Sequence, residues 1–187
     1  MKIVSILIIC ILCFLPACGF KLYSKEKLPP QLHTLYLQSD NPYGQFETDL
    51  KHSFKTMGIN FTDLQKQAPI TLKIINTNFS HDNLNAVSSS QATVYNFTYN
   101  VTFNLLDSHS KPIISSQTVK SDRTLTLNPN EVIDANPEVD TLKQEMQREL
   151  IFKILNRLSS KNAWRVLKVV HKKHETISKS ITTTSKK

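Results

Sequence analysis

The chain has 187 residues, and its 23 Lys and Arg against 15 Asp and Glu give a formal net charge of +8. Once a leader is removed, that length suits one domain with a real core. Three glycines, Gly19, Gly44 and Gly58, are too few for a glycine-rich phosphate loop or a Rossmann fingerprint, and no G-x-S-x-G nucleophile elbow is present.

The first 17 residues have the pattern of a cleaved export signal. Lys2 precedes an uncharged apolar run from Ile3 to Phe14. A membrane-spanning helix needs about 20 apolar residues, so this shorter run favours export over anchoring. Leu15-Pro16-Ala17-Cys18 then resembles a bacterial lipobox, with Pro16 as its one departure. The alternative is an ordinary secretory signal that happens to contain a cysteine.

The lipobox predicts that Cys18 is acylated and becomes the first residue of the mature chain. Gly19 stands where the inner-membrane retention signal would place Asp, so we expect a lipid-anchored protein of the outer membrane in a Gram-negative cell. Cys10 and Cys13 leave with the leader. The mature chain is therefore predicted to have no disulfide and no cysteine metal site.

The N-terminal half of the mature chain predicts a tether, a strand and a helix. Residues 18–30 are predicted to be a lipidated tether, which is polar from Lys21 and ends in two prolines, and residues 32–37 form a strand candidate. Asn41-Pro42 is predicted to open the first helix, with Asn41 as its cap. The apolar face of that helix follows from the spacing of Phe46, Leu50, Phe54 and Met57. Gly58 suits its left-handed C-terminal cap.

Strands dominate the middle of the chain. Residues 59–61 and 70–79 are candidates, and residues 94–106 alternate strictly between apolar and polar side chains. Such a long alternation predicts a half-buried strand of an antiparallel sheet. Residues 107–112 read as a turn, and residues 113–127 as the hairpin partner.

A second amphipathic helix closes the domain. Asn136-Pro137-Glu138 repeats the cap-plus-proline opening, and an apolar stripe then continues to about Ser159. We predict an α+β domain over residues 31–160, a two-layer sandwich in which two helices pack on one face of a mostly antiparallel four-stranded sheet. Residues 161–187 are predicted to be a basic, disordered tail.

In these features the chain resembles the LPS-assembly lipoprotein family, LptE. The resemblance covers about residues 18–158 and includes the order of the long strand, the hairpin and the terminal helix. The matching stretches are Cys18-Gly19-Phe20-Lys21-Leu22, Leu28-Pro29, Asp40-Asn41-Pro42-Tyr43-Gly44, and Leu50 to Gly58 followed by Ile59.

The resemblance implies that the protein is not an enzyme but acts as the partner of another protein. It would plug the LptD β-barrel and assist lipopolysaccharide in reaching the outer leaflet of the outer membrane. The predicted barrel contacts are Asn96, Thr98, Asn100 and Thr102, which share one face of the long strand. The alternative, that this face meets only water, stays open.

The resemblance also implies contact with anionic lipopolysaccharide through basic residues at one end of the sheet. The predicted loop from His81 to Thr93 contains no Lys or Arg, so it offers no such contact. Lys111, Lys120 and Arg123 are the remaining candidates in the sheet region, with ordinary solvated charges as the alternative for each.

Other chemistries find little support in the sequence. His171 and His174 are too few for a zinc site, and Glu145 with Glu149 fits an exposed helix face, so we expect no metal, cofactor or enzymatic activity. The basic tail does not predict nucleic-acid binding. Two alternatives stay open for the tail: it binds anionic phosphate groups of lipopolysaccharide or phospholipid, or it is simply solvated. A binding module for another envelope lipid or for peptidoglycan is the alternative function, and a small hydrolase is disfavoured.

Overall fold

The computed structural model describes residues 29–84, 92–128, 131–160, 163 and 165. The leader, the tether up to residue 28 and most of the tail therefore lie outside the described residues, and so do Cys18, Gly19, His171 and His174. The helices and strands in chain order are β1 (Thr34–Gln38), α2 (Gln45–Thr56), β2 (Asn60–Thr62), β3 (Ile70–Asn83), β4 (Thr93–Asp107), β5 (Pro112–Leu127) and α3 (Pro137–Leu158).

The sheet has five strands in the order β2-β1-β3-β4-β5, so the prediction of four strands was wrong. The additional member is β2, which has three residues and pairs with the edge of β1. So short a segment shows almost no alternation in the sequence. Its place is set instead by α2, because a parallel neighbour needs a crossover connection. β1 is parallel to β2 and β3, and the other pairs are antiparallel.

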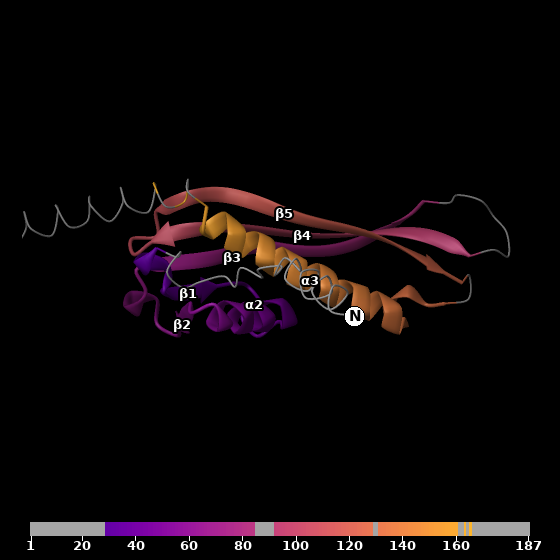
Figure 1. The fold of residues 1–187 in the computed structure, drawn as a ribbon, viewed down its shortest axis with the longest axis horizontal. Coiled ribbons are helices and arrows are strands. Elements are labelled where there is room, and N and C mark those ends of the chain that lie inside the picture. Colours follow the sequence, from indigo (N-terminus) through magenta and orange to yellow (C-terminus); the bar gives the residue numbers. More distant parts are fainter. Residues whose placement is uncertain (1–28, 85–91, 129–130, 161–162, 164, 166–187) are drawn as a thin grey trace, which may run out of the picture.

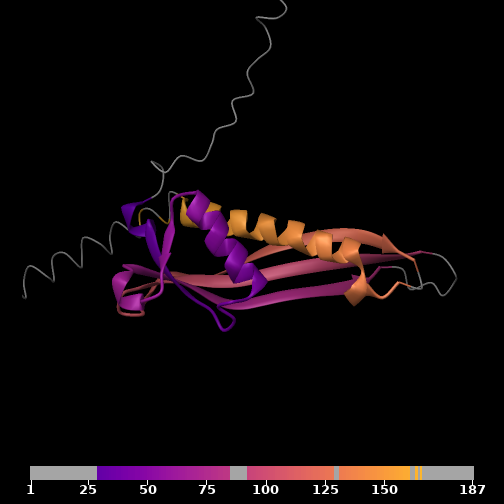
Figure 2. The same ribbon diagram turned by 90° about the horizontal axis from the view of Figure 1, so that it is seen from below.

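Both helices pack on one face of the sheet, which confirms the predicted two-layer α+β arrangement (Figure 2). Figure 1 shows α3 crossing β3, β4 and β5 obliquely, with α2, β1 and β2 gathered at one end. The core lies between the layers. It includes the predicted inward side chains of β4, which are Phe97, Tyr99, Val101, Phe103 and Leu105, and the predicted stripe of α3 from Val139 to Leu158.

The strand β3 changes which side chains face the helices partway along its length. Ile70, Leu72 and Ile74 are buried, and a bulge between Ile74 and Asn76 inserts Ile75 as an extra residue. A residue inserted on one strand shifts its alternation by one position. Phe79 therefore faces the helix side and stacks on Phe97, with ring centroids 5.7 Å apart.

The predicted loop from His81 to Thr93 is shorter than expected. β3 continues to Asn83 and β4 begins at Thr93, so His81 pairs with Phe97 in the sheet. The His81 ring lies 5.7 Å from the Phe97 ring and 5.8 Å from the Tyr95 ring. These ring contacts extend the strand through residues whose polarity suggested a loop.

The ends of the helices confirm most of the predicted caps. Asn136 caps α3, and its Oδ1 accepts a hydrogen bond from the Glu138 N–H at 2.8 Å. Gly58 has a φ of 86°, and the N–H groups of Gly58 and Ile59 reach back to Lys55 and Phe54 at the end of α2. This pair of bonds is the Schellman arrangement, for which glycine is favoured.

The predicted start of the first helix was wrong. α2 begins at Gln45 with Gly44 as its cap, not at Pro42 with Asn41. The Asn41 carbonyl accepts the Gly44 N–H at 2.9 Å and closes a turn ahead of the helix. Gly44 is also tightly enclosed, since a Cβ there would lie 2.5 Å from Glu47 Oε2. The turn therefore uses the residues that were expected to open the helix.

Candidate functional site

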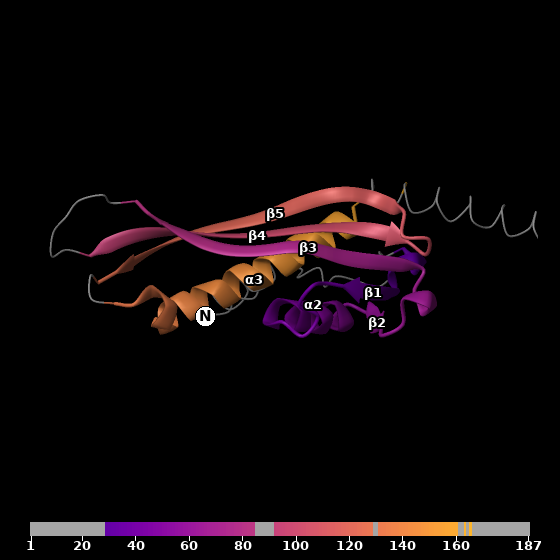
Figure 3. The same ribbon diagram turned by 180° about the vertical axis from the view of Figure 1, so that it is seen from behind.

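Among the described residues, one face of the sheet has no helix on it, and we call it the outer face (Figure 3). The predicted barrel contacts lie on this face of β4, because the odd-numbered side chains from Phe97 to Leu105 point into the core. The four predicted contacts are half-buried among their neighbours on β3 and β5. The sheet therefore brings Asn96, Thr98, Asn100 and Thr102 together in one row.

The outer face is built mostly of amides and hydroxyls. Across the three long strands, Asn100 lies between Asn78 and Lys120, and Thr102 lies between Asn76 and Thr118. The Thr102 and Thr118 hydroxyls share a hydrogen bond of 2.9 Å. Such short neutral side chains hold each other in place and leave a polar surface.

Charges on the outer face are few, and two of them form an ion pair. Lys120 Nζ lies 2.8 Å from Asp122 Oδ1, which also accepts the Thr98 hydroxyl at 2.8 Å. The hydrogen bond from Lys120, followed by that from Thr98, lowers the pKa of Asp122 below its usual range. The carboxylate therefore stays ionised and paired on this face.

Sequence reasoning missed one cation of the outer face, Lys73. It pairs with Asn104 in the sheet, and its buried neighbours Leu72 and Ile74 face the helices. The alternation of residues 70–74 places Lys73 on the face opposite its apolar neighbours, so this pattern would have identified the cation. Lys73 forms no salt bridge within the described part of the chain.

The structure does not bring the three predicted lipopolysaccharide contacts together. Lys111 is exposed in the turn between β4 and β5, while Lys120 projects from the outer face. Nine residues separate these two lysines, which is up to about 30 Å along an extended strand. Arg123 is on the helix side of β5, where its Nη2 lies 2.6 Å from Glu149 Oε2 on α3.

Glu149 holds α3 to the edge strand β5. Its carboxylate accepts hydrogen bonds from Ser121 Oγ at 2.8 Å and from Arg123, and it pairs with Lys153 at 2.6 Å. The hydrogen bond from Lys153 is the main cause that lowers the pKa of Glu149, and partial burial opposes it. Arg123 and Glu149 therefore have a structural role, which also accounts for the Glu149 noted in the sequence.

The described residues contain no cluster of metal-binding side chains. No set of three or more His, Cys, Asp or Glu side chains lies close enough to hold a metal ion in that part of the chain. His81 and Asp82 project from opposite faces of β3, since His81 pairs with the inward-facing Phe97 and Asp82 with Asn96 on the outer face. In the same ranges, neither helix combines the length and hydropathy of a membrane-spanning segment.

Comparison with known proteins extends these observations. A family model described as "LptE: Lipopolysaccharide-assembly" matches residues 32–158. The chain is 25% identical over 144 residues to the LPS-assembly lipoprotein LptE of Yersinia enterocolitica, with 75% of this chain and 68% of that protein covered. It is 26% identical over 155 residues to the protein of the same name from Yersinia pseudotuberculosis, with 80% and 72% covered.

Two solved structures share the fold. The solution structure of an uncharacterized lipoprotein B from Nitrosomonas europaea superposes with a TM-score of 0.62 at 21% identity, and 78% of this chain and 93% of that chain are covered. The crystal structure of the rare lipoprotein B from Shewanella oneidensis gives a TM-score of 0.58 at 16% identity, with 70% and 96% covered. Both likenesses support the two-layer architecture.

Proposed function

Because this chain belongs to the LptE family of lipopolysaccharide-assembly lipoproteins, we propose that it associates with an LptD-like β-barrel and plugs it. In this role it assists the assembly of lipopolysaccharide at the outer leaflet of the outer membrane. The role needs a folded surface that fits the barrel and needs no catalytic group.

The outer face, on which charged side chains are few, is the observation that carries this proposal. Exposed surfaces of soluble domains are ordinarily rich in Lys, Arg, Glu and Asp, whereas this face presents mainly Asn, Thr and Ser. Amides and hydroxyls lose far less solvation free energy on burial than charges do. Large barrels have polar interiors, so a largely neutral surface with spare donors and acceptors suits contact with such a wall.

The sequence also predicts a lipid anchor at the start of the mature chain. Acylation of Cys18, with Gly19 permitting outer-membrane sorting, would hold the domain at the periplasmic side of the membrane. Two or more acyl chains give stable anchoring. From Cys18 to Pro29 the chain can extend by about 35–40 Å at most, so the anchor keeps the domain close to the membrane.

Direct contact with lipopolysaccharide remains a prediction for three residues on separate surfaces. Lys120 and Arg123 are already in ion pairs with Asp122 and Glu149. Lys111 has no salt bridge among the described residues, so we expect its ammonium group to contribute most to any contact with lipid phosphates.

The test is to place charge on the outer face and measure recovery of the barrel. The double variant Asn100→Lys with Thr102→Lys should reduce the amount of LptD-like barrel that co-purifies from detergent-solubilised outer membrane at least about tenfold, because each buried unpaired charge costs several kcal/mol. The matched control is Thr141→Lys with Gln144→Lys, two exposed positions of α3. The recovered proteins are identified and quantified by mass spectrometry, and circular dichroism checks folding.

An unchanged yield with the outer-face variant would exclude this face as the contact. Recovery of the unmodified lipoprotein alone, from membranes that contain the barrel, would overturn the plugging role. It would favour the alternative, a periplasm-facing binding module for another envelope lipid or for peptidoglycan.

A further inference from the structure

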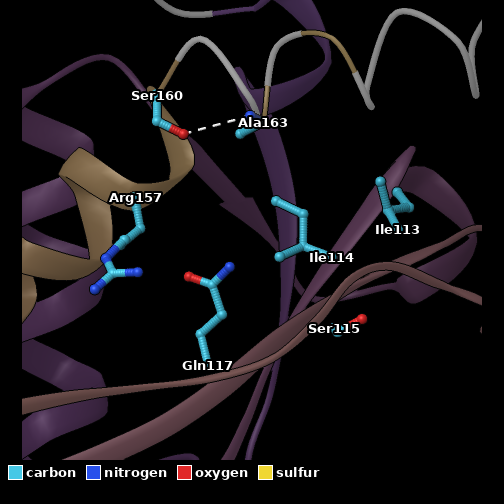
Figure 4. A pocket seen from close by; sticks show the side chains of 7 residues that line it. All are labelled: Ile113, Ile114, Ser115, Gln117, Arg157, Ser160 and Ala163. Atoms are coloured by element: carbon cyan, nitrogen blue, oxygen red, sulfur yellow. Dashed lines mark hydrogen bonds between the residues drawn. The ribbon is translucent and has the colours of Figure 1, made fainter.

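A cavity of about 370 Å³ lies between the start of β5 and the end of α3 (Figure 4). Its lining comes from Ile113, Ile114, Ser115 and Gln117 on the strand, and from Arg157, Ser160 and Ala163 at the end of the helix. Small-molecule sites in proteins occupy about 300–1,000 Å³, so this cavity is at the small end of that range. It is distinct from the outer face, because Gln117 pairs with the inward-facing Phe103.

One side of the cavity is polar and incompletely satisfied. Arg157 forms no salt bridge with any acid in the described ranges, although its guanidinium lines the cavity. Gln117 Oε1 is buried and accepts no hydrogen bond from the described residues. Figure 4 shows the Gln117 amide between Arg157 and Ile114. Because that oxygen is buried, an occupant of the cavity meets the amide nitrogen instead, which Figure 4 shows on the side of Ile114. A guanidinium binds phosphate or carboxylate oxygens in a bidentate manner, and the amide nitrogen can donate to a hydroxyl oxygen.

The other side of the cavity is apolar. Ile113 and Ile114 contribute branched side chains, and Ala163 is almost completely buried beside them. The Ala163 N–H donates to Ser160 Oγ at 3.3 Å, so these two lining residues are joined by a hydrogen bond. An occupant that satisfies both sides therefore combines an anionic head, which also accepts a hydrogen bond from the Gln117 amide nitrogen, with a short length of hydrocarbon.

The cavity is at the end of the molecule that also contains β1, β2 and the turn between β4 and β5 (Figure 3).

We propose that this cavity binds a single-chain glycerophospholipid, with its phosphate on Arg157, its glycerol hydroxyl on Gln117 and part of its acyl chain against Ile113 and Ile114. A lipid with several chains, such as lipopolysaccharide, is too large for this volume. The site is thus separate from the barrel contact, and binding here does not depend on the proposed plugging role.

The experiment uses the full acylated lipoprotein, without the barrel, in vesicles of neutral phosphatidylcholine. A lysophosphatidate with a photoreactive diazirine in its acyl chain is added and irradiated, and labelled peptides are mapped by mass spectrometry. We expect labelling concentrated on residues 113–117 and 157–163. Arg157→Gln should lower it about tenfold, as loss of a charge-assisted hydrogen bond implies. The control Arg148→Gln, an exposed arginine of the same helix, should change it less than twofold.

Two further probes separate the parts of the head group. A diazirine monoacylglycerol retains the hydroxyl groups without the charge, and a diazirine fatty acid retains a charge without the glycerol. Weaker labelling by both supports the assignment, and equal labelling by either one overturns it. Labelling spread evenly over the chain, or unaffected by Arg157→Gln in a protein with unchanged circular dichroism, also overturns it. Because no barrel is present, these results are independent of the co-purification test.

Discussion

Tyr99 lies where the sheet packs against the start of α2. Its ring centroid is 6.2 Å from that of Phe46 and 5.6 Å from that of Phe79. Burial raises the pKa of the Tyr99 phenol from 10.0 to about 12, and the carboxylate of Glu47 adds to this effect. The nearly fully buried Glu47 accepts the Ser39 hydroxyl at 2.5 Å, so a phenolate at Tyr99 would be placed close to an existing buried charge.

We predict an alkaline loss of stability that depends on Tyr99. The folded state retains the phenol proton more tightly than the unfolded chain does, so the free energy of unfolding should fall as the pH rises from about 10 to about 12. Tyr99→Phe should reduce this fall, as measured by urea unfolding across that range. The control Tyr43→Phe changes an almost fully exposed ring and should leave the fall as it is. Equal falls in both variants would contradict the assignment.

At the scale of elements, the Glu149 cluster joins α3 to β5 through Ser121, Arg123 and Lys153. The lowered pKa of Glu149 means that its charged form is favoured in the folded state. The stabilisation that the Glu149 carboxylate gives to the folded state is therefore complete above the ordinary pKa of 4.5. It is lost as the pH falls through the lower pKa that Glu149 has in the folded state.

Glu149→Gln is predicted to lower the free energy of unfolding by about 1 kcal/mol at pH 7, as for a partly exposed charge cluster. Denaturant titrations at several pH values should show this difference shrinking once the pH falls below 4.5. The control Glu145→Gln, one turn earlier and without a salt bridge among the described residues, should give a small difference at neutral pH. A Glu149→Gln deficit that persists unchanged at pH 3 would show that packing, not charge, causes it.

The bulge in β3 gives a second prediction for this scale. Deleting Ile75 removes the extra residue and leaves Phe79 on the helix side, because Asn76 then follows Ile74 in regular alternation. We therefore expect the deletion to lower the free energy of unfolding by about 1 kcal/mol or less, since the Ile75 side chain is 40% exposed. Phe79→Ala, by contrast, removes the ring contacts with Phe97 and Tyr99 and should cost about 1.5–3 kcal/mol. Urea unfolding of both variants tests the contrast, and equal losses would contradict it.

These elements also show what the sequence can and cannot predict. The strict alternation of β4 and the cap of α3 each involve several residues in one local pattern, and both were predicted correctly. The start of α2 was misplaced because a turn closed by Asn41 and Gly44 uses the same residue types as a helix cap. Residues 59–61 were a strand candidate but were left out of the four-stranded sheet, because three residues give little local signal and the place of β2 depends on pairing with β1, which is not a local property.

For the whole molecule, the candidate site was predictable only where one strand contains it. Asn96, Thr98, Asn100 and Thr102 follow from the alternation of β4 alone. The relative positions of Lys111, Lys120 and Arg123 depend on the alternation and bulges of β5, and the cavity at Arg157 depends on the packing of α3 over that strand. Surfaces built from two or more elements require the tertiary structure.

The two proposed binding surfaces differ in charge, so the salt dependence of binding should differ between them. Association through the neutral outer face should be little affected when NaCl is raised from about 0.1 M to about 1 M, which shortens the screening length from about 10 Å to about 3 Å. Recovery of the barrel in co-purification should therefore change less than about twofold. Photolabelling by lysophosphatidate depends on the exposed Arg157 and should fall over the same range. Loss of the barrel at high salt would instead indicate that cations such as Lys73 or Lys111 dominate its contact, because a neutral polar interface has no long-range attraction to screen.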